Sequence, residues 1–302
     1  MHAHTAEPCS EAQPAESIEP CPPPLAWQEV LQRFRADAKA WELSRGSYTL
    51  RGKTWGTGQP LYFLNGLTGN SELFSLLVWL LKDDYRCVLF DYPEHSARNR
   101  DGRRLTLSDY VDDLLAVADG QSDAAFSIYA TSFGVPLALK TMSTAPARIE
   151  RVILQGGDAW FPLTWFERLM IQCGRLIPGK VRHIPGRHTV WKQNHLPWFP
   201  PFDQTRWSFL DDVTGENSIR TIAHRLSLMH QHDLRPDLPR IVQPVLLIGT
   251  EGEGPRLGSR REELATRLPR SETQLLDSMG LFPFLTHPHR LKKIMHPFLS
   301  PT

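Results

Sequence analysis

The sequence has 302 residues, 41% of them hydrophobic, enough to bury the core of one large domain or of a domain with an insertion. With 34 basic and 33 acidic residues the formal net charge is +1, which gives no argument for a nucleic-acid partner or an anionic membrane. No apolar run approaches the roughly 18 to 20 residues of a membrane span, so we expect no integral membrane segment.

The four cysteines, Cys9, Cys21, Cys87 and Cys173, are widely spaced and form no C-x-x-C pattern. This spacing argues against a zinc site and fits free thiols in a reducing compartment. The N-terminus has neither the basic nor the apolar region of a secretory leader, so we expect a cytoplasmic protein. No P-loop, G-x-G-x-x-G or HExxH motif occurs, and we expect no cofactor and no metal.

The chain begins with a segment of unusual composition. Residues 1–24 hold six prolines, four glutamates and no lysine or arginine, which predicts a flexible acidic tail. Apolar residues at helical spacing predict a helix over 25–41. The alternating stretch 46–55 predicts a leading antiparallel strand or hairpin.

From Pro60 onward, buried strands alternate with helices. Continuous apolar strands separated by helices predict an α/β fold with a mostly parallel sheet covered on both faces. Asn70 is placed to cap one helix, and Thr106 or Ser108 to begin the next. The predicted strands cover 60–66, 86–93, 125–131, 151–157, 244–250 and 273–280, and the predicted helices cover 70–83, 106–119 and 134–142. We assign residues 25–157 and 241–302 to this core.

Residues 158–240 interrupt the pattern with a long stretch that has no strand signal and carries five of the nine tryptophans. We expect a helical lid over the carboxyl edge of the sheet, where open α/β folds bind ligands. Trp160 and Trp165 are candidate binding residues, although such aromatics can equally pack the lid against the core. Between Glu167 and Asp203 every charged residue is basic, which could serve an anionic ligand, an acidic partner or a headgroup surface. A simple solvated face is the favoured alternative.

The pentapeptide Ala130-Thr131-Ser132-Phe133-Gly134 lies between a predicted buried strand and a predicted helix. A serine on such a sharp strand-to-helix turn exposes its hydroxyl beside a helix N-terminus. Small residues are needed two positions to either side, because the strand, turn and helix approach closely. Ser132 is therefore the candidate nucleophile, or what remains of one.

Two backbone N–H groups could stabilise an oxyanion beside Ser132. One belongs to Phe133. The second should come from the loop after an earlier strand, where Asn65 and Gly66 end the strand and place the N–H of Leu67 next to the site. An ordinary glycine turn is the alternative for this loop. We include Asn65 and Gly66 among the candidate binding residues.

Four segments together resemble the α/β-hydrolase family, over about residues 56–300. "LNGLTG" resembles its His-Gly-x-x-Gly loop, "DYPEHSA" its Asp-x-Pro-Gly-His-Gly segment, and "PVLLIGTEGEGP" the strand and loop that carry the triad acid. "GLFPFLTHP" resembles the segment that carries the triad histidine. The resemblance implies eight mainly parallel strands with a lid after the sixth.

The resemblance also implies that the general base is missing, because its position is Leu281. Leucine cannot accept a proton, and a serine hydroxyl without a base is a poor nucleophile at neutral pH. Replacement by another histidine is a weaker alternative. The candidates are His287 and His289 in the last helix, His95 on a neighbouring loop, and His183, His188 and His195 in the lid.

The acid position is altered as well. The family's aspartate falls near Gly252, which leaves Glu251 as a weak candidate acid. Asp158, after the sixth strand, is the alternative acid site used by some members, and it could instead cap the first lid helix.

Within the family, the likeness is greatest to maspardin-like members. Tyr92-Pro93, the non-histidine Leu281 and a lid-end pattern "FLDDV…RLSLMHQ" carry that likeness. It implies a catalytically degenerate protein that binds a protein partner or a small apolar ligand through its lid and pocket. The alternative is a carboxylesterase-like serine hydrolase acting on a hydrophobic ester, with Ser132 and a non-standard base. The oligomeric state is left open.

Overall fold

The computed structural model describes residues 26–201, 203–277 and 279–300, so the predicted tail lies outside the described residues. Eight strands form one sheet in the order β1-β2-β4-β3-β5-β6-β7-β8. β2 is antiparallel to both β1 and β4, and all other neighbours are parallel. The strands are β1 (Lys39–Ser44), β2 (Thr49–Trp55), β3 (Gln59–Leu64), β4 (Tyr85–Phe90), β5 (Phe126–Thr131), β6 (Ile149–Gln155), β7 (Val245–Thr250) and β8 (Ser271–Leu276).

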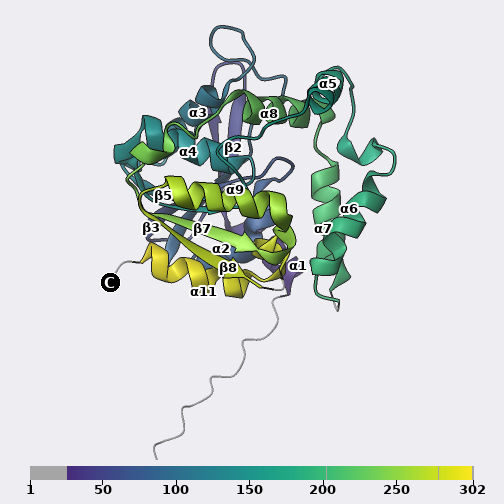
Figure 1. Ribbon diagram of the computed structural model, residues 1–302. Helices are drawn as coiled ribbons and strands as arrows, with labels where there is room; N and C mark the ends of the chain where they lie inside the picture. The colour runs from purple at the N-terminus through teal and green to yellow at the C-terminus, as the bar shows by residue number, and fades with distance from the viewer. Residues whose placement is uncertain (1–25, 202, 278, 301–302) are drawn as a thin grey trace, which may run out of the picture.

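Helices cover both faces of this sheet (Figure 1). Those that belong to the core are α1 (Trp27–Asp37), α2 (Ser75–Leu81), α3 (Leu107–Gly120), α4 (Gly134–Thr144), α9 (Gly254–Arg267), α10 (Pro283–Thr286) and α11 (Pro288–Leu299). The chain between β6 and β7, which we call the inserted segment, holds α5 (Trp165–Gly174), α6 (Arg187–His195), α7 (Gln204–Gly215) and α8 (Ile219–Gln231). Figure 1 shows α5, α6 and α7 together at one side of the molecule.

The alternation of side chains along the strands divides the buried residues between two cores. In β3, Tyr62 and Leu64 pack with residues of α3, α4 and α9 on one face. Leu61 and Phe63 pack with residues of α1, α2 and α11 on the other. Both faces of the strand are therefore apolar, which explains why the parallel strands read as continuous hydrophobic runs.

The helix predicted over 25–41 is wrong at its C-terminal end. Helix α1 ends at Asp37, and β1 begins at Lys39. The Trp41 side chain packs over Gly52 of β2 and donates a hydrogen bond to Thr54 Oγ1 at 3.1 Å. Pairing with β2 therefore outweighs the helical spacing, and the predicted leading strand becomes half of a hairpin.

Two predicted caps are confirmed. The Asn70 side chain accepts a hydrogen bond from the backbone N–H of Glu72, at the start of a 3-10 turn that leads into α2. Thr106, and not Ser108, is the N-cap of α3, where it forms a capping box with Asp109. Among the described residues, no helix is both long and apolar enough to cross a bilayer.

The first turn of α4 packs directly on the end of β3. A Cβ atom added to Gly134 would lie 2.6 Å from the carbonyl oxygen of Leu64, well inside van der Waals contact. We predict that Gly134→Ala lowers the free energy of unfolding by about 1–3 kcal/mol, because the strand and helix must separate. Urea unfolding measures this change.

Gly120→Ala in α3 is the matched control, because a Cβ there meets no atom within 4 Å. It should be neutral or slightly stabilising, since alanine favours a helix more than glycine does. Equal losses of stability in the two variants would contradict the proposed close contact.

Candidate active site at the carboxyl edge of the sheet

Ser132 lies on the turn between β5 and α4. Its φ of 49° is in the left-handed region, which non-glycine residues rarely adopt. Its backbone N–H donates to the carbonyl of Gln155 at 3.1 Å, and its own carbonyl accepts from Val135 at 3.0 Å. These bonds fix a strained turn that leaves the half-buried side chain of Ser132 on the wall of a cavity.

The loop after β3 lies against this turn. A Cβ added to Gly66 would be 3.4 Å from Ser132 Cβ and 3.9 Å from Ser132 Oγ, so the loop and the serine are in contact. The backbone N–H groups of Leu67 and Phe133 donate no hydrogen bond to any other described residue. Both remain available for an external acceptor, and their assignment as oxyanion donors stays a prediction. Asn65 and Gly66 line the cavity, as expected of binding residues.

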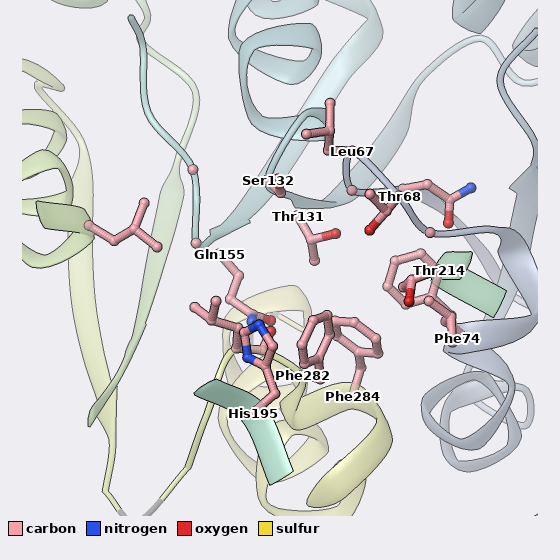
Figure 2. A pocket seen from close by; sticks show the side chains of 18 of the residues that line it. Leu67, Thr68, Phe74, Thr131, Ser132, Gln155, His195, Thr214, Phe282 and Phe284 are labelled. Carbon is pink, nitrogen blue, oxygen red and sulfur yellow. The ribbon is translucent and has the colours of Figure 1, made fainter. Parts of the chain in front are cut away.

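The cavity has a volume of about 300 Å³ and lies between the core and the inserted segment. In Figure 2, Ser132 and Thr131 lie on one side of it, and His195, Phe282 and Phe284 lie on the other. Most of its lining is apolar. The apolar side chains are those of Leu67, Leu73, Phe74, Phe161, Trp191, Met229, Leu257, Leu281, Phe282 and Phe284.

Leu281 lies in the cavity wall, in the segment between β8 and α10. Its backbone carbonyl accepts a hydrogen bond from Gln155 Nε2 at 3.0 Å. The buried hydroxyl of Tyr129 donates to the other end of the Gln155 amide. This chain of bonds runs from β5 through β6 to the segment that follows β8, and it fixes Leu281 at the site.

Sequence reasoning missed Gln155 altogether. A polar residue at the end of the otherwise apolar strand "RVILQ" was the available signal, because such a residue must find partners when it is buried.

The two candidate acids are in different surroundings. Glu251 is exposed and does not line the cavity. Next to it, Gly252 donates a backbone hydrogen bond to Met279 at 2.8 Å. The Trp198 side chain covers this junction, since a Cβ on Gly252 or on Gly280 would lie 2.7 Å from it. Trp198 therefore packs over the loops that follow β7 and β8, a contact that the sequence did not predict.

Asp158 is the acid that lies at the cavity. Only 3% of it is exposed, and its Oδ1 has no hydrogen-bond partner among the described residues. Burial raises the pKa of this carboxyl to about 6, although Arg260 and Arg256 oppose the change. The alternative role as a helix cap is wrong, because α5 begins at Trp165 with Thr164 as its N-cap.

One histidine of the inserted segment reaches the cavity. The His195 ring contacts those of Trp191 and Phe282, with centroids 4.2 and 5.3 Å apart, and forms no hydrogen bond to Ser132 or to any other described residue. Burial lowers the pKa of His195 to about 4, so its imidazole is neutral at pH 7. The other candidates do not line the cavity: His95, His183, His188, His287 and His289.

The two tryptophans expected to bind a ligand lie elsewhere. Trp160 donates its indole N–H to the carbonyl of His230 at 3.1 Å and stacks under Arg235. Trp165 is 71% exposed on the outside of α5. Neither lines the cavity, so a binding role for either would have to be outside it. The sequence places both near the end of β6 but does not determine which way the side chains point.

With the fold and the site in place, comparison with known proteins gives the family. A sequence model of the alpha/beta hydrolase family matches residues 61–294, most of the chain. The chain belongs to this family.

Individual relatives are more distant. A stretch of 117 residues is 36% identical to a serine hydrolase-like protein of Danio rerio, and this match spans 37% of the chain and only 36% of that relative. A pimeloyl-[acyl-carrier protein] methyl ester esterase of Nitrosomonas europaea is 24% identical over 251 residues, which cover 79% of the chain and 94% of the esterase.

Solved structures confirm the fold. A hydrolase of Pseudomonas aeruginosa superposes with a TM-score of 0.71 at 19% identity, over 88% of this chain and 99% of that protein. An enol-lactonase of Burkholderia xenovorans gives a TM-score of 0.70 at 19% identity, over 86% of this chain and 100% of that protein. At such identities the likeness concerns the fold and not the reaction.

The burial of Asp158 gives a pH-dependent difference in stability. Its folded pKa of about 6 lies above the usual 3.8, so the carboxyl favours folding below pH 4, and that contribution is lost as the pH rises through 6. We predict that Asp158→Asn is more stable than the wild type at pH 8, by up to about 3 kcal/mol. At pH 4 the two should be nearly equal. Urea unfolding at both values measures the difference.

The exposed Asp212 of α7 gives the matched control. Asp212→Asn should leave the difference from the wild type nearly the same at the two pH values. A constant difference for Asp158→Asn as well would show that this carboxyl ionises as freely in the folded chain as in the unfolded one.

Proposed function

We propose that this protein is a non-catalytic member of the α/β-hydrolase family, which holds a small, largely apolar ligand in the cavity beside Ser132. In this proposal residues 158–240, which make up most of the inserted segment, are a lid that closes the cavity and contributes to binding a partner. The proposal includes the maspardin-like character and the cytoplasmic location inferred from the sequence.

The observation that carries the proposal is the surroundings of the Ser132 hydroxyl. Leu281 lies in the cavity wall, and the resemblance of its segment to the family's histidine segment assigns it the position of the general base. Its side chain can neither accept nor donate a proton. No hydrogen bond joins Ser132 to a histidine among the described residues. A serine hydroxyl in such surroundings stays protonated at neutral pH and attacks esters poorly.

The cavity itself supports a binding role. Its wall is built mainly from leucine and aromatic side chains, with a few polar groups among them, the usual composition of a small-molecule site. Two of the polar groups, Asn65 Oδ1 and Asp158 Oδ1, are buried without a hydrogen-bond partner among the described residues. A ligand with an apolar body and a hydrogen-bond donor would satisfy both requirements.

A serine hydrolase is the second candidate, and His195 is the observation in its favour. This histidine lines the same cavity as Ser132 and is neutral at pH 7, so it could approach if α6 moved. Its pKa of about 4 counts against it, because a general base works best when its pKa is near the operating pH. In that case Ser132 would attack a hydrophobic ester, and Leu67 and Phe133 would hold the oxyanion.

Hydrolysis of p-nitrophenyl butyrate distinguishes the two candidates. We predict that the wild type and Ser132→Ala hydrolyse this ester at the same background rate, because loss of the base lowers turnover by about 10⁴- to 10⁶-fold. If the wild type is clearly faster than Ser132→Ala, the protein is a hydrolase. Loss of that activity in His195→Gln would then identify the base.

Ligand binding is tested with 1-anilinonaphthalene-8-sulfonate, whose fluorescence rises in apolar surroundings. We predict that the wild type binds the dye and that Leu281→Trp weakens binding at least about tenfold, because the larger ring fills the cavity. Leu275→Trp is the matched control, since Leu275 is 60% exposed on β8 and lies outside the cavity. Equal binding by both folded variants would place the dye elsewhere and contradict the proposed site.

A further inference from the structure

Helix α5 carries an apolar surface that nothing in the described chain covers. Four of its residues are more than half exposed, and two more follow directly after the helix. We call these six residues the α5 patch: Trp165, Phe166, Leu169, Met170, Leu176 and Ile177. The described residues include 10 exposed large apolar side chains, and more than half of these lie in this short stretch. Such clustering marks an interaction surface.

The helix turns this surface outward because of how it packs on α8. Glu167, Ile171 and Gly174 are spaced as i, i+4 and i+7 and are less exposed than the patch. Gly174 allows close contact, since a Cβ there would lie 3.3 Å from Ala223 Cβ of α8. The residues of the α5 patch therefore occupy the opposite side of the helix. In Figure 1, α5 lies at the periphery of the molecule.

Arginines without an acidic partner lie on and beside the patch. Arg104, Arg168, Arg175 and Arg220 form no ion pair with any described residue. Arg220 donates to the carbonyl of Leu176 at 2.9 Å, which places it at the end of the patch. Burial lowers the pKa of Arg175, and the nearby positive charge of Arg104 lowers it further. The one acid on α5, Glu167, is held by Thr164 at the start of the helix.

Three of the other cations in the basic stretch pair with acids of the inserted segment, whereas Lys192 of α6 forms no ion pair with a described residue. Lys180 and Arg182 pair with Glu216, and Arg187 pairs with Asp211. The cations that flank the α5 patch therefore keep their positive charge without a neighbouring acid, unlike Lys180, Arg182 and Arg187.

We propose that the α5 patch docks the protein on the surface of an anionic lipid bilayer. An exposed apolar helix face that carries tryptophan and phenylalanine, with arginines at its border, is the pattern of a helix that lies in the membrane interface. A second copy of this chain fits less well, because a symmetric contact would bring the same arginines together. The lipid headgroups supply the negative charge that the described residues do not.

Vesicle sedimentation with the full chain tests this docking. The protein should sediment with vesicles of phosphatidylcholine and phosphatidylglycerol, bind vesicles of phosphatidylcholine alone much more weakly, and be released by high salt. Trp165→Ser should weaken binding about tenfold. Arg168→Gln and Arg175→Gln should each weaken binding to the anionic vesicles about fivefold.

Matched controls come from exposed residues elsewhere on the molecule. Leu275→Ser removes an apolar side chain that is 60% exposed, and Arg240→Gln removes an exposed arginine; neither should change binding. Absence of wild-type binding, equal binding to both kinds of vesicle, or no effect of Trp165→Ser would overturn the proposal. So would a concentration-dependent dimer in analytical ultracentrifugation that Trp165→Ser abolishes, which would assign the patch to a second copy. Because the test involves neither Ser132 nor the cavity, its outcome is independent of the ligand-binding proposal.

Discussion

The close approach of β3, the Ser132 turn and α4 is the constraint on which the rest of the site depends. A Cβ atom at position 134 would lie 2.6 Å from the carbonyl oxygen of Leu64. Only glycine therefore lets the start of α4 pack against β3. The carbonyl of Ser132 lies equally close to Gly157, 2.7 Å from where its Cβ would be. The turn is thus held from two sides, which keeps Ser132 at a φ of 49°.

This constraint separates the geometry of the turn from its chemistry. The turn positions the hydroxyl of Ser132 and the backbone N–H of Phe133 whether or not a base is present, because its shape comes from packing between β3, β5 and α4. By the resemblance to the family, the base would come from a different element, the segment after β8, where the chain has Leu281. Under the proposed function, the serine turn persists as part of the cavity wall while the group that would activate it is absent.

The elements that sequence could predict are those decided by neighbouring residues. Ala130, Ser132 and Gly134 identify the turn by their spacing, and Asn70 and Thr106 identify helix starts by capping chemistry that acts within three residues. The central parallel strands, such as β5 and β7, follow from apolar runs, since each is buried on both faces. Local pattern was sufficient in all of these cases.

Sequence could not predict contacts that depend on distant partners. Gln155 and Leu281 are 126 residues apart, and their hydrogen bond exists only once the strands are in order. Trp198 covers Gly252 and Gly280 from the inserted segment, and Trp41 leaves a helical pattern to pair with β2. The direction of Trp165 was missed for the same reason, because only the packing of α5 on α8 decides which face of the helix is outside.

The inserted segment therefore presents two different surfaces. Its inner side brings His195 and Trp191 to the cavity, where burial keeps the imidazole neutral. Its outer side carries exposed apolar groups with unpaired arginines around them. A ligand that is mostly apolar partitions into membranes. A surface that holds the protein at a bilayer would therefore bring the cavity close to such a ligand. If both proposals hold, one segment connects the source of the ligand with the site that receives it.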